Sequence, residues 1–144
     1  MSQHQATLLA IGCILFVIGL IINLAFDYKQ ILTTGINHKN LSHLLRKASI
    51  MMPSGVILSF AIAVHTKWLW SIVFTSLMEM FVFWVVFDII LNILRSEKWY
   101  YIGSPDKFDS GTEKMERRLP LFWTWLIKFA LAFASIYAYI KLLD

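Results

Sequence analysis

Three ionisable residues, Glu79, Asp88 and Lys128, stand inside long apolar runs of the sequence. A charged side chain at the centre of a bilayer costs at least ~2.5–3.5 kcal/mol, so such residues usually pair with one another or line a hydrated path. The chemistry open to them is therefore binding of a proton or an ion, or pairing that fixes one helix against another. Which of these applies depends on the elements that carry them.

The apolar runs themselves are long enough to form membrane spans. A helix of about 20 apolar residues crosses the ~30 Å hydrocarbon core of a bilayer. The hydrophobic share of 58% exceeds the roughly 45–50% of soluble domains, so lipid must cover part of this surface. The sequence predicts an all-α polytopic membrane protein, a single four-transmembrane-helix bundle over residues 1–144, with spans at about 7–26, 48–64, 68–94 and 119–143.

The basic residues predict how this bundle is oriented. The connections 27–47 and 95–118 share one side of the membrane and carry most of the Lys and Arg, whereas Lys67 and Lys141 lie on the other side. Cytoplasmic loops are enriched in Lys and Arg, so both connections should be cytoplasmic and both termini outside, in a bacterial inner membrane. The ten residues on the cytoplasmic side are Lys29, Lys39, Arg46, Lys47, Arg95, Lys98, Lys107, Lys114, Arg117 and Arg118.

The direction of each span indicates which acid meets Lys128. Side chains lean toward the N-terminus of their helix. The span 119–143 begins at the cytoplasmic side, so Lys128 leans toward the level of Asp88, whereas Glu79 leans outward. With a rise of ~1.5 Å per residue, the Asp88 backbone is ~5 Å from the level of Lys128 and Glu79 is ~8 Å from it. We therefore expect the pair Asp88–Lys128 and a different partner for Glu79.

A stripe of polar and small residues marks the expected inner face of the last span. Its members recur at helical spacing: Thr124, Lys128, Ala132, Ser135 and Tyr139. Ser135 and Tyr139 stand at or outside the level of Glu79, and they could hydrogen-bond to it if Glu79 faced this stripe.

A second polar set is expected near the cytoplasmic surface. Asp88, Asn92 and Arg95 share one face of the third span, and Asn23 and Asp27, four residues apart, share a face at the end of the first. Together they could form a polar layer. Hydration at helix ends explains such residues without a function, while the depth of Glu79 and Lys128 leaves two readings open: they line a path, or they only fix helix packing.

Signatures of enzymes and cofactor sites are missing from the sequence. There is no HExxH, GxSxG or P-loop spacing. Cys13 is the only cysteine, and His4, His38, His43 and His65 fall in tails, loops or span boundaries. We therefore expect no enzyme activity, no cofactor and no metal. The net charge of +4 is explained by loops facing anionic lipid headgroups, so nucleic acid is not an expected partner.

One segment resembles a known pattern. Phe87-Asp88, Asn92 and Arg95, followed by Trp99-Tyr100-Tyr101, Gly103 and Asp109, are similar to small uncharacterised multi-pass membrane proteins of bacterial phages and prophages. The similarity covers residues 87–109. Those proteins often have Gly after the Arg and a basic residue after the final Asp, where this chain has Ser96 and Ser110. The resemblance implies a phage-related gene, and those proteins have no established activity to extend to this chain.

These observations favour a non-enzymatic structural or partner-binding membrane component. Its 95–118 loop, which is aromatic and carries both charges, would present the surface for a protein partner or a second copy of the chain. The alternative is a holin-like or small ion-conducting pore-forming oligomer with Lys128 and Glu79 along the path. Against a holin, the cationic residues are not gathered at the C-terminus, which ends Lys141-Leu-Leu-Asp144.

Overall fold

The chain folds into long α-helices. The computed structural model describes residues 2–34, 41–63, 67–101 and 119–143. Within these residues it contains four helices, each long and apolar enough to cross a membrane. They are α1 (Gln3–Thr34), α2 (Leu41–Ile62), α3 (Trp68–Leu94) and α5 (Leu121–Leu143). The prediction of an all-α chain with four such helices is confirmed.

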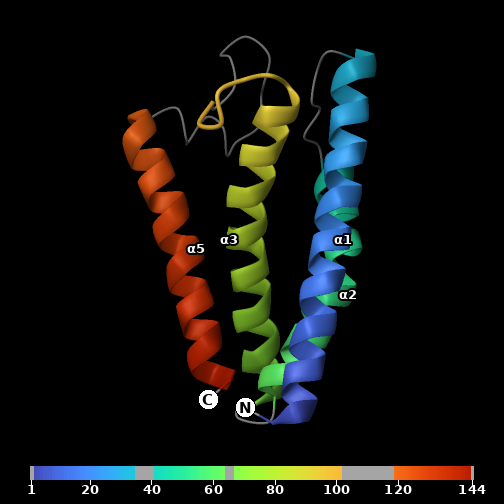
Figure 1. The fold of residues 1–144 in the computed structure, drawn as a ribbon, viewed down its shortest axis with the longest axis vertical. Coiled ribbons are helices and arrows are strands. Elements are labelled where there is room, and N and C mark those ends of the chain that lie inside the picture. The colour runs from blue at the N-terminus through green and yellow to red at the C-terminus, as the bar shows by residue number, and fades with distance from the viewer. Residues whose placement is uncertain (1, 35–40, 64–66, 102–118, 144) are drawn as a thin grey trace.

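The helices stand roughly upright beside one another, with α3 between α5 and the α1–α2 pair (Figure 1). α3 contacts each of the other three helices. Both ends of the chain lie at the same end of the bundle (Figure 1). α3 is therefore the element through which side chains of α1, α2 and α5 can be brought together.

α1 is longer than the span expected at 7–26, because a capping motif starts it early and nothing breaks it at Asp27. The Ser2 hydroxyl accepts from the Gln5 backbone N–H at 3.2 Å, while Gln5 Oε1 accepts from the Ser2 N–H at 2.7 Å. This reciprocal pair is a capping box, which satisfies two free N–H groups of the first turn. Asp27, expected at the end of the helix, instead lies more than a turn inside it.

α2 also begins earlier than the span expected at 48–64. The segment Leu41–Lys47, expected as a short interfacial helix, is continuous with the rest of α2. Pro53 stands inside this helix, where its missing N–H removes one backbone hydrogen bond. The continuity matters because Arg46 and Lys47 are thereby held on the same rigid element as Ser54.

α3 covers the expected 68–94 and ends in a Schellman motif. The Glu97 N–H donates to the Asn92 carbonyl at 2.9 Å and the Ser96 N–H donates to the Ile93 carbonyl at 3.0 Å. Ser96 takes a positive φ of 58°, in the left-handed region that this motif requires. The following turn is thus tied back to the last turn of α3.

Ser96→Gly is expected to stabilise the protein. The left-handed conformation costs an L-residue roughly 1–2 kcal/mol, and glycine avoids this cost. Glycine also gives the unfolded chain more conformational freedom, which lowers the gain by about 0.5–1 kcal/mol. We expect a net gain of about 0.5–1 kcal/mol in the free energy of unfolding, measured in detergent micelles by titration with SDS. Ser49→Gly, within helical α2, is the matched control and should lower it; a loss in both variants would contradict the argument.

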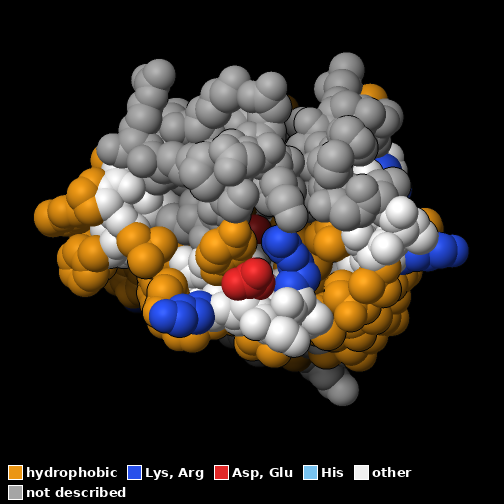
Figure 2. Space-filling model, turned by 90° about the horizontal axis from the view of Figure 1, so that it is seen from above, with side chains coloured by type: hydrophobic (Ala, Val, Ile, Leu, Met, Phe, Trp, Pro, Cys, Tyr) orange, Lys and Arg blue, Asp and Glu red, His pale blue; other side chains and the backbone are white. Residues whose placement is uncertain are grey.

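The outside of the bundle is apolar along most of its length. Ile14, Ile21, Phe133 and Leu69 have exposed fractions of 58–69%. Figure 2 looks onto the end opposite the chain termini and shows charged side chains there, with hydrophobic side chains around the flanks. An apolar belt with charges gathered at an end is the surface expected where lipid replaces water as the solvent.

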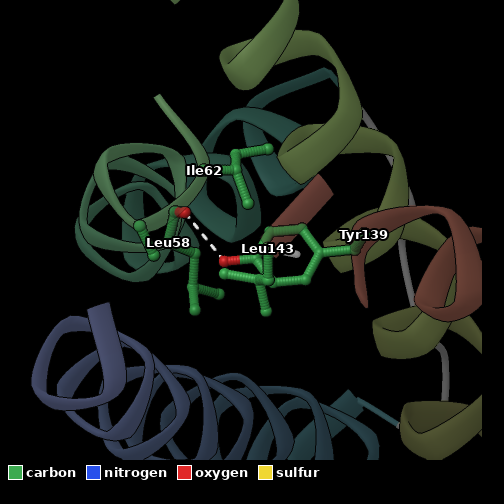
Figure 3. Close-up of a cluster of buried hydrophobic side chains, with 5 residues drawn as sticks. Leu58, Ile62, Tyr139 and Leu143 are labelled. Carbon is green, nitrogen blue, oxygen red and sulfur yellow. Dashed lines mark hydrogen bonds between the residues drawn. The ribbon is translucent and has the colours of Figure 1, made fainter. Parts of the chain in front are cut away.

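The described interior contains three small hydrophobic clusters, and two side chains donate hydrogen bonds to backbone carbonyls at one of them. Near the chain termini, Tyr139 of α5 points at α2 and donates to the Leu58 carbonyl at 2.8 Å, with Ile62 and Leu143 beside it (Figure 3). Gln5 Nε2 of α1 donates to the carbonyl of Ala61 in the last turn of α2 at 3.2 Å. The last turn of a helix carries unsatisfied carbonyls, and here α1 provides a donor for one of them.

Candidate functional site

Lys128 and Asp88 form an ion pair between α5 and α3. Lys128 Nζ lies 2.7 Å from Asp88 Oδ2, within hydrogen-bond range. The Lys128 side chain is 2% exposed and that of Asp88 is 26% exposed. The pair predicted from depth and side-chain direction is present. Because Asp88 reaches the surface while Lys128 does not, the carboxylate is the exposed member of the pair.

Aromatic rings complete the surroundings of the Lys128 ammonium group. Its Nζ is 4.7 Å from the ring centroid of Trp84 and 4.9 Å from that of Trp125. Both distances fall within the ~6 Å range of a cation–π contact, which is strongest for Trp and for a cation removed from water. Trp125 is held in turn by its Nε1, which donates to the Tyr100 carbonyl at 2.8 Å. Lys128 is therefore enclosed by one carboxylate and two indoles.

The expected inner face of α5 is the one that the structure buries. Thr124, Lys128, Ala132 and Tyr139 are all buried, and Ser135 is half-buried. The suggested bonds from Ser135 and Tyr139 to Glu79 are not the ones formed. Ser135 donates to the Ala132 carbonyl of its own helix at 2.8 Å, and Tyr139 donates to Leu58. Both hydroxyls thus donate to backbone carbonyls and not to Glu79.

Glu79, near the middle of α3, faces α2. Its Oε1 lies 2.5 Å from the Ser54 hydroxyl, and its exposed fraction is 7%. A Cβ atom built on Gly55 would stand 2.7 Å from Glu79 Oε2. Glycine at 55 therefore leaves the space that the carboxyl group fills. The partner of Glu79 is thus a hydroxyl on α2, next to Pro53.

A second charged cluster joins α1 to α2. Asp27 is fully buried, and its Oδ1 accepts from Arg46 Nη2 at 2.6 Å, while its Oδ2 lies 2.9 Å from Lys47 Nζ. Lys47 Nζ also lies 3.7 Å from the ring centroid of Phe87 on α3. Two cations on one turn of α2 thus meet one carboxylate of α1, against an aromatic ring of α3.

The polar layer expected from Asn23, Asp27, Asp88, Asn92 and Arg95 is divided among different partners. Asp27 binds α2 and Asp88 binds α5, as described above, and Asn23 Nδ2 donates to the Gly19 carbonyl of its own helix at 3.0 Å. Asn92 Nδ2 donates to the backbone carbonyls of Trp99 and Tyr101, at 3.0 and 2.8 Å. Arg95 Cζ lies 5.9 Å from the ring centroid of Tyr101. The sequence places these residues at one depth but does not show which direction each faces.

Two buried hydroxyls were missed from sequence. Ser71 and Thr75 precede Glu79 on α3 at four-residue intervals, and both are fully buried. The spacing of 71, 75 and 79 is the signal that could have revealed them, because residues four apart share a helix face. Thr75 Oγ1 has no hydrogen-bond partner among the residues that the structure describes.

Residues 102–118, which form most of the expected recognition loop, lie outside the described residues. Over the part of the chain that the structure does describe, no group of three His, Cys, Asp or Glu side chains is placed to hold a metal ion. In comparisons by sequence and by fold, no protein-family model, curated protein or solved structure matches this chain. The site must therefore be interpreted from its own geometry.

Proposed function

We propose that this chain is an integral, multi-pass protein of a bacterial cytoplasmic membrane, with both termini outside. Four helices of sufficient length and apolarity support the membrane assignment. The orientation is supported by the placement of both termini at one end of the bundle, together with the excess of Lys and Arg in connections 27–47 and 95–118.

Within that membrane we assign it a non-enzymatic structural or partner-binding role. The single observation that favours this role over a conducting one is the enclosure of Lys128, 2% exposed, by Asp88, Trp84 and Trp125 of the same chain. A residue that lines a conducting path must meet water, whereas this ammonium group meets only protein. Its role is then to join α5 to α3.

The surface proposed for a partner begins at the segment after α3. Asn92 and Trp125 both bond to backbone carbonyls of residues 99–101, so this start of the 95–118 loop is fixed to two helices. Trp99 is 47% exposed there. Exposed aromatic side chains on a fixed backbone are typical anchors for a protein partner. We further propose that Arg46, 32% exposed beside Asp27, contacts anionic lipid headgroups at the same end.

A pore-forming oligomer, holin-like or ion-conducting, is the second candidate. The observation that favours it is the 26% exposure of the Asp88 side chain on a helix whose exposed side chains are mostly apolar. If copies of the chain assembled with their α3–α5 faces inward, this carboxylate would be the group presented to the path.

Membrane potential separates the two candidates. Cells induced to express the wild type or Lys128→Met at matched levels are followed with a potential-sensitive dye. We expect no depolarisation by either, and reduced accumulation of Lys128→Met because Asp88 loses its partner. Lys141→Met, on the exposed face of the same helix, is the matched control and should accumulate normally. Depolarisation by the wild type that Lys128→Met abolishes without loss of protein would make this chain a pore.

A further inference from the structure

We propose that Glu79 is a proton-binding site, protonated in the folded protein, whose proton exchanges with the end of the bundle that carries the chain termini. This goes beyond the structural role proposed above, in which Lys128 and Asp88 join two helices. Three observations support it: the hydrogen bonds around Ser54, the surroundings of the Glu79 carboxyl group, and the sequence of side chains along one face of α3.

Two short contacts of the Ser54 hydroxyl favour a protonated Glu79. Ser54 Oγ lies 2.6 Å from the Met51 carbonyl and 2.5 Å from Glu79 Oε1. A serine hydroxyl has one hydrogen, and a carbonyl oxygen can only accept. If Ser54 donates to Met51, the contact with Glu79 is a hydrogen bond only when the carboxylic acid donates to Ser54 Oγ. In that arrangement Glu79 donates to Ser54 and Ser54 donates to the Met51 carbonyl, and both O···O distances are in the range of O–H···O hydrogen bonds.

The surroundings of Glu79 also favour the neutral acid. Glu79 is 7% exposed, and no Lys or Arg in the described residues pairs with it. A buried carboxylate without a cation is strongly disfavoured, so the group neutralises instead. The ionisable group of another helix that interacts with Glu79 is Tyr139 on α5, which is itself an acid. Tyr139 cannot offset a negative charge on Glu79.

The face of α3 that carries Glu79 is polar on one side of it and aromatic on the other. Toward the start of α3, residues 71 and 75 present buried hydroxyls, each about 6 Å along the helix from the next. Thr75 Oγ1 has no hydrogen-bond partner among the described residues, so its hydroxyl is available to relay a proton. In the opposite direction the same spacing reaches Phe83 and Phe87, whose rings stack with centroids 4.9 Å apart. A proton on Glu79 therefore has hydroxyls toward the chain termini and hydrocarbon toward the charged end.

Infrared spectroscopy of the protein in lipid bilayers tests protonation directly. The wild type should show the C=O stretch of a protonated, hydrogen-bonded carboxylic acid at neutral pH, and Glu79→Gln should lack it. Glu97→Gln, which removes an exposed carboxyl group just after α3, is the matched control and should keep the band. Helical circular dichroism verifies that each variant is folded.

Covalent labelling gives an independent readout. A hydrophobic carbodiimide reacts with a protonated carboxyl group inside a membrane: the carboxyl oxygen bonds to the central carbon, its proton moves to a nitrogen, and the adduct rearranges to a stable N-acylurea without losing any group. We expect one adduct in the intact mass of the wild type and of Glu97→Gln, and none in Glu79→Gln. The absence of both the infrared band and the adduct in the folded wild type, or their persistence in Glu79→Gln, would overturn the proposal.

The exchange route has its own test. On transfer to D₂O the carboxylic acid band shifts as its proton is replaced by deuterium. Thr75→Val, which keeps the shape of the side chain and removes its hydroxyl, should slow this shift severalfold. Thr7→Val, which makes the same change at an exposed position of α1, should not. Equal rates in the wild type and Thr75→Val would place the route elsewhere and refute this part of the proposal.

Discussion

Asp88→Ala should destabilise the bundle by about 3–5 kcal/mol, the usual cost of removing one member of a buried ion pair. The cost arises at Lys128, whose side chain is 2% exposed and whose ammonium group loses the carboxylate 2.7 Å away. Trp84 and Trp125 remain, and a desolvated cation–π contact contributes about 2 kcal/mol or more, so the rings offset part of this cost. The free energy of unfolding is measured by adding SDS to the protein in mild detergent and following helical circular dichroism.

A double variant keeps this prediction falsifiable. Asp88→Leu combined with Lys128→Met removes both charges, and apolar replacement of a buried pair is often neutral or stabilising. The double variant should therefore recover most of the loss seen with Asp88→Ala. Recovery would identify the cost with an uncompensated lysine. A loss below about 1 kcal/mol in Asp88→Ala, the range of an exposed pair, would show that the ion pair contributes little.

Asp27→Ala is expected to destabilise the protein by about 3 kcal/mol, and Lys47→Met by clearly less. Asp27 is fully buried and contacts two cations, so removing it takes from Arg46 and Lys47 the carboxylate that they share. Removing Lys47 leaves Asp27 still bonded to Arg46 at 2.6 Å. The free energy of unfolding of each variant is measured by the same SDS titration.

The matched control for Asp27 is Glu97→Gln, because Glu97 is an exposed acid at the same end of the bundle. Its effect should lie within about 0.5 kcal/mol of zero, as for most surface substitutions. If Lys47→Met proved more damaging than Asp27→Ala, the cation–π contact of Lys47 with Phe87 would outweigh the ion pair, contrary to this account.

The Asp88–Lys128 pair could be predicted because it depends on two properties that can be read along the sequence, the depth of each residue and the direction of its helix. The depth of a residue in a span follows from counting, and the lean of its side chain follows from helix direction. The half-turn between Glu79 and Asp88 also indicated that the two acids face different neighbours, and they do: Asp88 faces α5 and Glu79 faces α2.

The partners of Glu79 and Asp27 could not be predicted, because they depend on how each helix is rotated and on where it ends. Nothing local in the sequence indicates that Ser54 and Gly55 turn toward α3. Asp27 was expected near hydrated headgroups at a helix end, but α1 continues to Thr34 and buries it against α2. The early start of α1, by contrast, could have been predicted, because Ser2-x-x-Gln5 matches the pattern of a capping box.

The most direct test of the central claim, that charges within the apolar helices are neutralised inside one chain, is solid-state NMR of the protein in lipid bilayers. Protein labelled with ¹⁵N at lysine side chains and ¹³C at aspartate should give Nζ–Cγ cross-peaks for the pairs Lys128–Asp88 and Lys47–Asp27, whose N–O distances are 2.7 and 2.9 Å. Lys128→Met should remove the first cross-peak alone and Lys47→Met the second alone. A spectrum of the wild type without the Lys128 cross-peak would contradict the account.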